Sequence, residues 1–160
     1  MRTLSNLMLA FPQQGTLEWI GLRPQRRAPM QSVESAEAIA ERGLSGDHRA
    51  ARIGGNRQVT LIQREHLASL AKSLGCSTID PALLRRNLVV SGIDLAALLH
   101  GEFAIGEVVL VGTGTCTPCA RMDQALGPGG RNAMSGRGGI TARVVRGGVV
   151  RLQDRVSLEK

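Results

Sequence analysis

The sequence is poor in aromatic residues. Phe11, Trp19 and Phe103 are its only aromatics among 160 residues, and it has no tyrosine. The core is therefore expected to be aliphatic, and the aromatic platforms on which many proteins stack single-stranded nucleic acid are nearly absent. Hydrophobic residues still make up 42% of the chain, which is enough for a packed core and excludes wholesale disorder.

Long apolar runs and paired cysteines are also missing. No run approaches the roughly 18 apolar residues that a membrane-spanning helix needs. The opening residues, MRTLSNLMLAFPQQG, show no cleavage pattern of a signal peptide. The three cysteines are an odd number and do not predict a disulfide framework. We therefore expect a soluble, cytoplasmic protein with no membrane partner.

Lysine is nearly absent from a basic chain. The net charge is +7, yet Lys72 and Lys160 are the only lysines among 20 basic residues. One interpretation is a GC-rich genome that encodes basic positions as arginine. The other is a partner bearing phosphate or carboxylate groups, which arginine binds bidentately. Nucleic acid is disfavoured as that partner, because the arginines are scattered and no zinc-finger, KH or RRM signature is present.

The length and the pattern of short apolar segments predict a single domain over residues 1–160. Strands are expected at 16–22, 57–63, 87–91, 104–111 with a bulge at its glycine, and in a hairpin of 140–145 and 149–158 around 146–148. Helical segments are expected at 33–42 after a Ser32 cap, at 64–74, near 80–81 and at 93–99. Without regular βαβ alternation, this order predicts a mainly β protein: a closed or near-closed antiparallel barrel with a few short peripheral helices.

The motif Cys116-Thr117-Pro118-Cys119 is the sharpest local signal for chemistry. Four interpretations remain open: a redox pair, a zinc site completed by Cys76 and a histidine, inert buried thiols, or one functional thiolate. Pro118 favours the first turn of a helix, so Cys119 is expected near unpaired N–H groups that lower the pKa of a thiol. A thiolate is a soft ligand, suited to a heavy metal centre or to carrying sulfur.

Other segments are candidates for binding an anion. The glycine-rich stretch 127–139, with Arg137, is either a mobile loop or a cradle for phosphate. Arg86 and Asn87 precede a strand, and His48 lies in the long Gly-rich loop at 43–56, so each is either a surface residue or a ligand contact.

The order of the motifs resembles a known family. The segments are WIGLRP, GLSGDH, RQVTLIQREHL, RRNLVVSGIDL, FAIGEVVLVGTGTCTPC and GRGGITARVVRGG. Together they resemble the MOSC domain, named for the C-terminal domain of molybdenum cofactor sulfurase, over about residues 17–156. Two departures occur: His48 follows Asp47 without the family's spacer residue, and Gln153-Asp154 replaces the usual Gly-Asp.

The resemblance implies a barrel like that of pyruvate kinase and a molybdenum cofactor (molybdopterin). Cys119 matches the family's central cysteine, which implies the catalytic thiolate and metal ligand. Arg86, Asn87 and His48 match family motifs and are expected to contact the cofactor. Thr115 and Arg137 are expected as further cofactor contacts. Pyridoxal phosphate enters only by family association, since the sulfurases carry a separate domain for it.

Three functions follow as expectations. The first is an oxidoreductase that binds molybdenum cofactor and acts on N-hydroxylated small molecules. The second is a sulfur carrier in metal–sulfur cofactor assembly, with a Cys119 persulfide, and the third is a non-catalytic module for polyanions. The sequence has no flavin, haem or iron–sulfur motif, so a partner protein is expected to donate the electrons or the sulfur.

Overall fold

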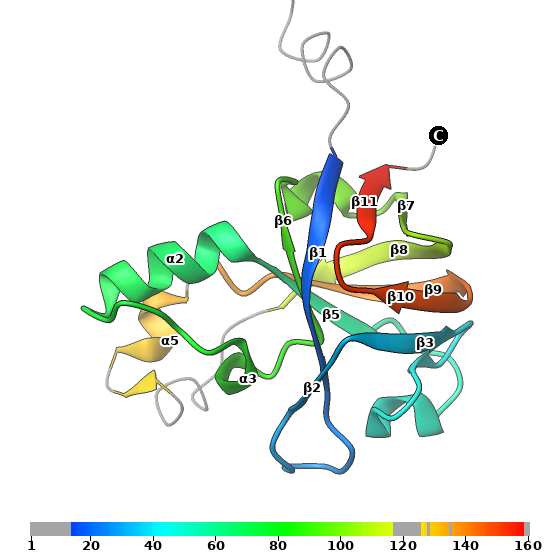
Figure 1. Ribbon diagram of the computed structural model, residues 1–160, viewed down its shortest axis with the longest axis horizontal. Helices are drawn as coiled ribbons and strands as arrows, with labels where there is room; N and C mark the ends of the chain where they lie inside the picture. Colours follow the sequence, from blue (N-terminus) through cyan, green and yellow to red (C-terminus); the bar gives the residue numbers. More distant parts are fainter. Residues whose placement is uncertain (1–13, 117–125, 128, 135, 159–160) are drawn as a thin grey trace, which may run out of the picture.

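A closed β-barrel forms the main body of the computed structural model, which describes residues 14–116, 126–127, 129–134 and 136–158 (Figure 1). Seven strands follow one another in the order β11-β7-β8-β9-β5-β6-β1, and β1 pairs back onto β11 to close the barrel. These strands are β1 (Gln14–Leu22), β5 (Val59–Gln63), β6 (Leu88–Ser91), β7 (Glu102–Ile105), β8 (Val108–Thr115), β9 (Ile140–Arg146) and β11 (Arg155–Leu158). The predicted mainly β barrel is confirmed.

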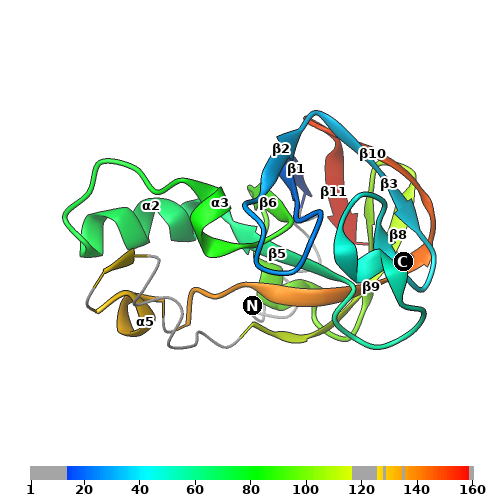
Figure 2. The ribbon, with the colours of Figure 1, turned by 90° about the horizontal axis from the view of Figure 1, so that it is seen from below.

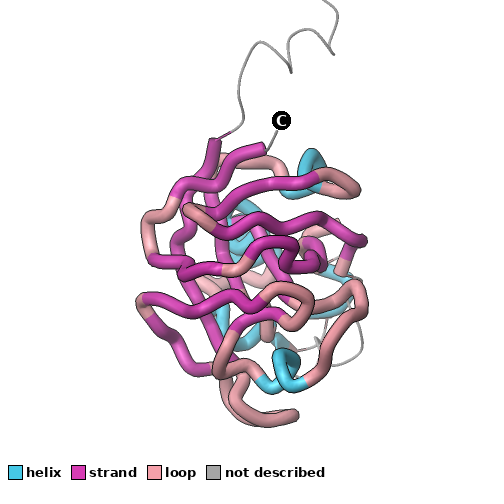
Figure 3. The backbone as a smooth tube through the Cα atoms, turned by 90° about the vertical axis from the view of Figure 1, so that its right-hand side faces the viewer, coloured by secondary structure: helices cyan, strands magenta, loops and turns pink. Residues whose placement is uncertain are grey.

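All barrel pairings are antiparallel except one. β5 and β6 run parallel, because the chain between them crosses over through α2 (Arg64–Ser73) and α3 (Pro81–Leu84). Beside the barrel, β2 (Gln31–Val33) pairs with β1, and a small sheet has the order β10-β3-β4. Its strands are β3 (Ser35–Ile39), β4 (Gly43–Leu44) and β10 (Gly148–Arg151). Figure 3 shows these strands wrapping around a common interior.

Two aliphatic cores meet at strands β5 and β6. Leu61 and Leu88 belong to the large cluster inside the barrel, whereas Ile62 and Val89 point to the other face and pack with Leu67 of α2. Both faces of these strands are therefore covered, which explains their nearly continuous apolar sequences. Figure 2 shows α2, α3 and the short α5 (Gly130–Ala133) gathered on this one side of the barrel.

The helix expected at 33–42 is not present. That stretch forms β2 and β3 instead, and β3 pairs with both β10 and β4. Ala36 and Ala38 are buried while Glu37 between them is exposed, an alternation of period two. Alanine and glutamate favour helices locally, but sheet pairing and burial of the two alanines outweigh that small preference.

Two further strand predictions were wrong in their connections. The strand expected at 104–111 is a hairpin of β7 and β8, and Gly106 lies in its turn with a φ of 57°. The hairpin expected around 146–148 is absent: β9 pairs with β5 and β8, whereas β10 pairs with β3. A Cβ added at Gly147 would lie 2.6 Å from the carbonyl oxygen of Ala38, so the glycine permits close passage rather than a tight hairpin turn.

In the part of the chain that the structure describes, no helix has both the length and the apolar character needed to cross a membrane.

Candidate functional site: an arginine-lined cavity

A cavity of about 410 Å³ lies at the end of the barrel formed by the β1–β2 loop, the loop after β4, and the segment from α3 to β6. Six arginines line it: Arg23, Arg49, Arg52, Arg57, Arg85 and Arg86. They come from three separated stretches of sequence that the fold brings together. The scattered arginines thus become a cluster of one charge sign around a concave surface.

Asp47 is the single carboxylate among the described residues that line this cavity, and the protein's own donors occupy both of its oxygens. Oδ1 accepts a hydrogen bond from the backbone N–H of Arg49 at 3.0 Å. Oδ2 accepts one from the backbone N–H of Arg23 at 3.0 Å and one from the Asn87 side chain at 2.9 Å. Asp47 also caps the short helix η1 (His48–Ala51). The carboxylate therefore orders the cavity wall, while the arginines set the charge that a ligand meets.

Asn87 ties three elements together beneath the cavity. Its Nδ2 donates to the carbonyl oxygen of Gly21 in β1 at 3.1 Å as well as to Asp47. Its Oδ1 accepts from the backbone N–H of Thr60 in β5 at 3.1 Å and from the Thr60 hydroxyl at 3.2 Å. Both amide hydrogens are thus engaged, so the side chain of Asn87 positions the surrounding residues.

Arg86 and Cys116 both donate hydrogen bonds to the short segment 138–139, just before β9. Arg86 Nε donates to the carbonyl oxygen of Gly138 at 2.8 Å, and its Nη1 donates to that of Leu84 at 2.8 Å. The backbone N–H of Cys116 donates to the carbonyl oxygen of Gly139 at 2.9 Å. These bonds fix the direction of the Arg86 guanidinium and place the Cys116 thiol at the cavity wall.

The Cys116 thiol is buried, and burial raises its pKa. Arg86 and Arg57 oppose this shift by favouring the negative thiolate, but desolvation is the larger effect. Cys116 is therefore mainly a neutral thiol near pH 7. Cys119, the predicted catalytic thiolate and metal ligand, lies outside the described residues.

Two buried nitrogens at the cavity lack a hydrogen-bond partner among the described residues. They are Arg23 Nε and His48 Nε2, and both side chains line the cavity. The backbone of His48 is held in place because its N–H donates to the carbonyl oxygen of Arg23 at 2.8 Å. Buried polar groups are normally satisfied, so this pair marks a place where a ligand oxygen is expected.

His48 sits in a surrounding that disfavours its protonated form. Burial lowers its pKa most, and Arg23 adds to the effect. Asp47 raises the pKa, whereas Arg52 and Arg26 lower it further. The balance leaves a neutral imidazole facing the cavity at neutral pH.

This environment predicts a pH-dependent contribution to stability. Because the folded protein disfavours protonated His48, the unfolded chain binds more protons as the pH falls through about 6.5 and below. The His48 contribution is therefore complete above that pH and is lost on acidification. As the pH is lowered, we expect the melting temperature of the wild type to fall more steeply than that of His48→Gln. Differential scanning calorimetry would measure both. Parallel curves for the two proteins would contradict the inferred environment of His48.

Arg49 braces the loop that carries two of the other arginines. Its guanidinium donates to the carbonyl oxygens of Arg52, Gly54 and Arg57. The Thr113 hydroxyl donates to Asn56 in the same loop. The sequence predicts a long Gly-rich loop here and makes His48 a candidate ligand contact, but its pattern does not single out the arginines. Their spacing gave no signal, since only the fold places them opposite Arg86.

The remaining sequence-predicted contacts lie elsewhere. Thr115 is exposed at the end of β8, and Arg137 donates to the Ser73 hydroxyl of α2 at 2.9 Å and to the carbonyl oxygen of Ala133 at 3.2 Å. Neither lines the cavity, whereas Arg86, Asn87 and His48 all do. Among the described residues, no three His, Cys, Asp or Glu side chains cluster as a metal site would require.

Comparison with known families identifies the domain. The family model of the MOSC domain matches residues 46–157. This chain belongs to the MOSC family. The match includes the loop after β4, the α3–β6 segment and the end of β8, which together supply most of the cavity wall.

Solved structures share the fold of this MOSC protein at low identity. The YuaD protein from Bacillus subtilis matches with a TM-score of 0.76 and 20% identity, over 91% of this chain and 96% of that one. YiiM from Geobacillus stearothermophilus gives 0.72 and 14%, over 91% and 75%. YiiM from Escherichia coli gives 0.69 and 19%, over 91% and 70%. No curated protein sequence matches the chain significantly.

Proposed function

We propose that this MOSC protein binds molybdenum cofactor in the arginine-lined cavity and acts as an oxidoreductase on N-hydroxylated small molecules. The observation that carries the proposal is the donor set. Among the described residues, six arginines line the cavity, the carboxylate of Asp47 is engaged by the protein's own donors, and Arg23 Nε and His48 Nε2 are buried without a hydrogen-bond partner. Molybdopterin bears a phosphate, whose oxygens suit such donors.

The described residues that line the cavity fit the charge of the cofactor's phosphate. The Arg23 and Arg86 guanidiniums would hold the phosphate, with His48 Nε2 as a further hydrogen-bond partner. The chain continues from the end of β8 towards Cys119, whose thiolate would supply the soft ligand. When bound, the cofactor supplies a redox-active molybdenum centre.

The protein's own groups have separate tasks in this proposal. Asp47 and Asn87 keep the arginine-bearing walls at fixed positions, so the donors are organised before the ligand arrives. Arg86 lines the cavity and is tied to Gly138 and Leu84, so its guanidinium is held in place before a ligand binds. Electrons would come from a partner protein, since the sequence carries no motif for a second redox cofactor.

The test is to purify the protein from a host that makes molybdenum cofactor, then to measure metal content and oxidised-pterin fluorescence. Bound pterin with molybdenum is the expected result.

Arg86→Ala should weaken cofactor binding by about 1.5–3 kcal/mol, as loss of a charged hydrogen bond does. Cys119→Ser should abolish turnover of N-hydroxylated compounds, because a hydroxyl is a harder and far less acidic ligand. Cys116→Ser is the matched control and should keep most of the activity.

Other outcomes would replace the proposal. A Cys119 persulfide without pterin, seen by mass spectrometry, would establish the sulfur carrier. Salt-sensitive binding of polyanions with neither pterin nor persulfide would establish the non-catalytic module. Equal loss of activity in Cys116→Ser and Cys119→Ser would point to a paired thiol site.

A further inference from the structure

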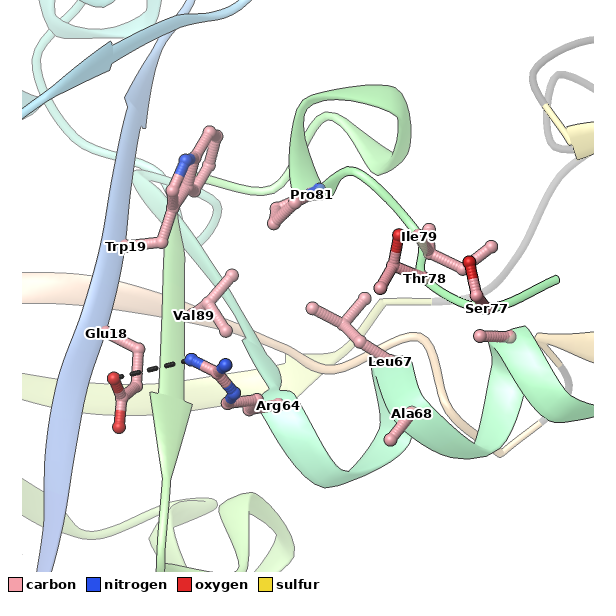
Figure 4. Close-up of a pocket in the computed structure, with 11 residues that line it drawn as sticks. Glu18, Trp19, Arg64, Leu67, Ala68, Ser77, Thr78, Ile79, Pro81 and Val89 are labelled. Atoms are coloured by element: carbon pink, nitrogen blue, oxygen red, sulfur yellow. Dashed lines mark hydrogen bonds and ion pairs between the residues drawn. The ribbon is translucent and has the colours of Figure 1, made fainter.

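A second cavity, of about 360 Å³, lies on the helical side of the barrel (Figure 4). Leu67 of α2, Val89 of β6 and Pro81 of α3 point into it, and Trp19 of β1 forms one wall. It shares no lining residue with the arginine-lined cavity. We call this second cavity the tryptophan groove. Its volume and its largely apolar wall are those of a small-molecule site.

A neighbouring glycine, Gly21, leaves the space that the indole of Trp19 occupies beside the groove. A Cβ at Gly21, two residues along β1 on the same face, would overlap the Trp19 ring atoms Cη2 and Cζ3. The absent side chain therefore lets the ring lie along the strand. Trp19 is the chain's single tryptophan and is half-buried. Its ring therefore offers an aromatic surface to a ligand in the groove.

One charged group at the groove is sheltered and incompletely paired. Glu18 Oε1 accepts a hydrogen bond from the Ser91 hydroxyl at 2.7 Å, which fixes the carboxylate. Among the described residues, Oε2 has only a long contact of 3.5 Å to Arg64 Nη1. The Arg64 side chain is 65% exposed, against 23% for Glu18, so solvent weakens that pair. A cation entering the groove could approach Oε2 more closely than Arg64 does.

We propose that the tryptophan groove binds a small aromatic amine. The ring lies against Trp19, Leu67 and Val89, and the protonated amine takes the place of Arg64 at Glu18 Oε2. Burial of the ring supplies most of the affinity, and the charge-assisted hydrogen bond selects a cation over a neutral or anionic analogue. This proposal does not depend on molybdenum cofactor or on any residue of the arginine-lined cavity.

The fluorescence of Trp19 is a direct readout, because it is the protein's only tryptophan. Benzylamine, benzyl alcohol and benzoate present the same ring with positive, neutral and negative substituents. We expect benzylamine to produce a saturable change in emission with a dissociation constant of about 1 mM, a value typical of so small a ligand. Benzyl alcohol should bind roughly tenfold more weakly, and benzoate more weakly still.

Variants on two walls locate the ligand. Ala68 is an exposed residue of α2 that lines the groove, so Ala68→Phe should obstruct it and abolish the benzylamine response. Ala96→Phe, the same change at an exposed position of η2 (Leu95–Leu98) outside the groove, should leave the response unchanged. Glu18→Gln should weaken benzylamine roughly tenfold and leave benzyl alcohol unaffected, which tests the charge contact without altering the shape.

The proposal is overturned by any of three results. The first is no saturable response up to about ten times the expected dissociation constant. The second is benzoate binding as tightly as benzylamine. The third is a benzylamine response that is unchanged in both single variants, Ala68→Phe and Glu18→Gln. Pterin and molybdenum content are independent of all three, so this proposal and the proposed function fail separately.

Discussion

Replacing Gly139 with alanine is expected to lower the free energy of unfolding by about 3 kcal/mol, through overpacking and backbone strain together. A Cβ at this position would overlap the carbonyl oxygen of Leu61 and lie 2.9 Å from its carbonyl carbon. The backbone also adopts a φ of 86°, which alanine disfavours. The carbonyl group of Leu61 is part of β5, so it cannot move away without loss of the β5–β9 pairing. Urea unfolding followed by circular dichroism would measure the change.

Gly136→Ala separates the two causes. Gly136 has a similar φ of 74°, but a Cβ there would have no atom within 4 Å. Its substitution should therefore cost only the backbone term, about 1 kcal/mol. Equal destabilisation by the two variants would show that the close approach to Leu61 contributes nothing. Gly139→Ala should also disturb the wall of the arginine-lined cavity, because Gly139 accepts the backbone hydrogen bond from Cys116 and adjoins the Gly138 carbonyl that holds Arg86.

Periodic apolar patterns made the elements around the second core predictable. The helix expected at 64–74 is α2, with Leu67, Leu70 and Ala71 buried as their spacing indicated. The strands on either side of it, β5 and β6, also lie where they were expected, within two residues. In these segments local preference and tertiary burial agree, so the sequence alone is sufficient.

Connections between strands were harder to predict. Gly106 reads equally as a bulge or as a turn, and only the pairing of β7 with β8 decides. Gly147 and Gly148 are typical of a hairpin, yet the chain there passes from the barrel to the small sheet. A glycine signals that a side chain is excluded or a φ is unusual, but not which segment makes it so.

The candidate site was predictable in part for a related reason. Arg86, Asn87 and His48 were identified from motifs and all line one cavity. Arg23, Arg52 and Arg57 carry no local signal, because arginine in a loop is ordinarily a solvated charge. Their clustering depends on the placement of the β1–β2 loop and η1 over the end of β5, which is a property of the fold.

The network beneath that cavity predicts the second large effect. Asn87→Leu should lower the free energy of unfolding by about 3 kcal/mol or more, because several buried polar groups lose their partner at once. The side chain makes four hydrogen bonds, to Gly21, Asp47, and both the N–H and the hydroxyl of Thr60. Leucine is of similar size but can satisfy none of them. Thermal and urea unfolding would measure the loss.

Thr60→Val is the control that shows whether the amide of Asn87 is the centre of this network. The substitution removes the Thr60 hydroxyl, which donates to Asn87 Oδ1 and accepts from the backbone N–H of Asn87. That backbone N–H keeps a second acceptor, the carbonyl oxygen of Thr60 at 3.1 Å. A cost of about 1 kcal/mol is therefore expected. Asn87→Leu should in addition release Asp47 from one of its donors, and so loosen the N-terminus of η1 and the position of Arg23. If Asn87→Leu unfolds at the same denaturant concentration and temperature as Thr60→Val, Asp47 holds the cavity wall without help from Asn87.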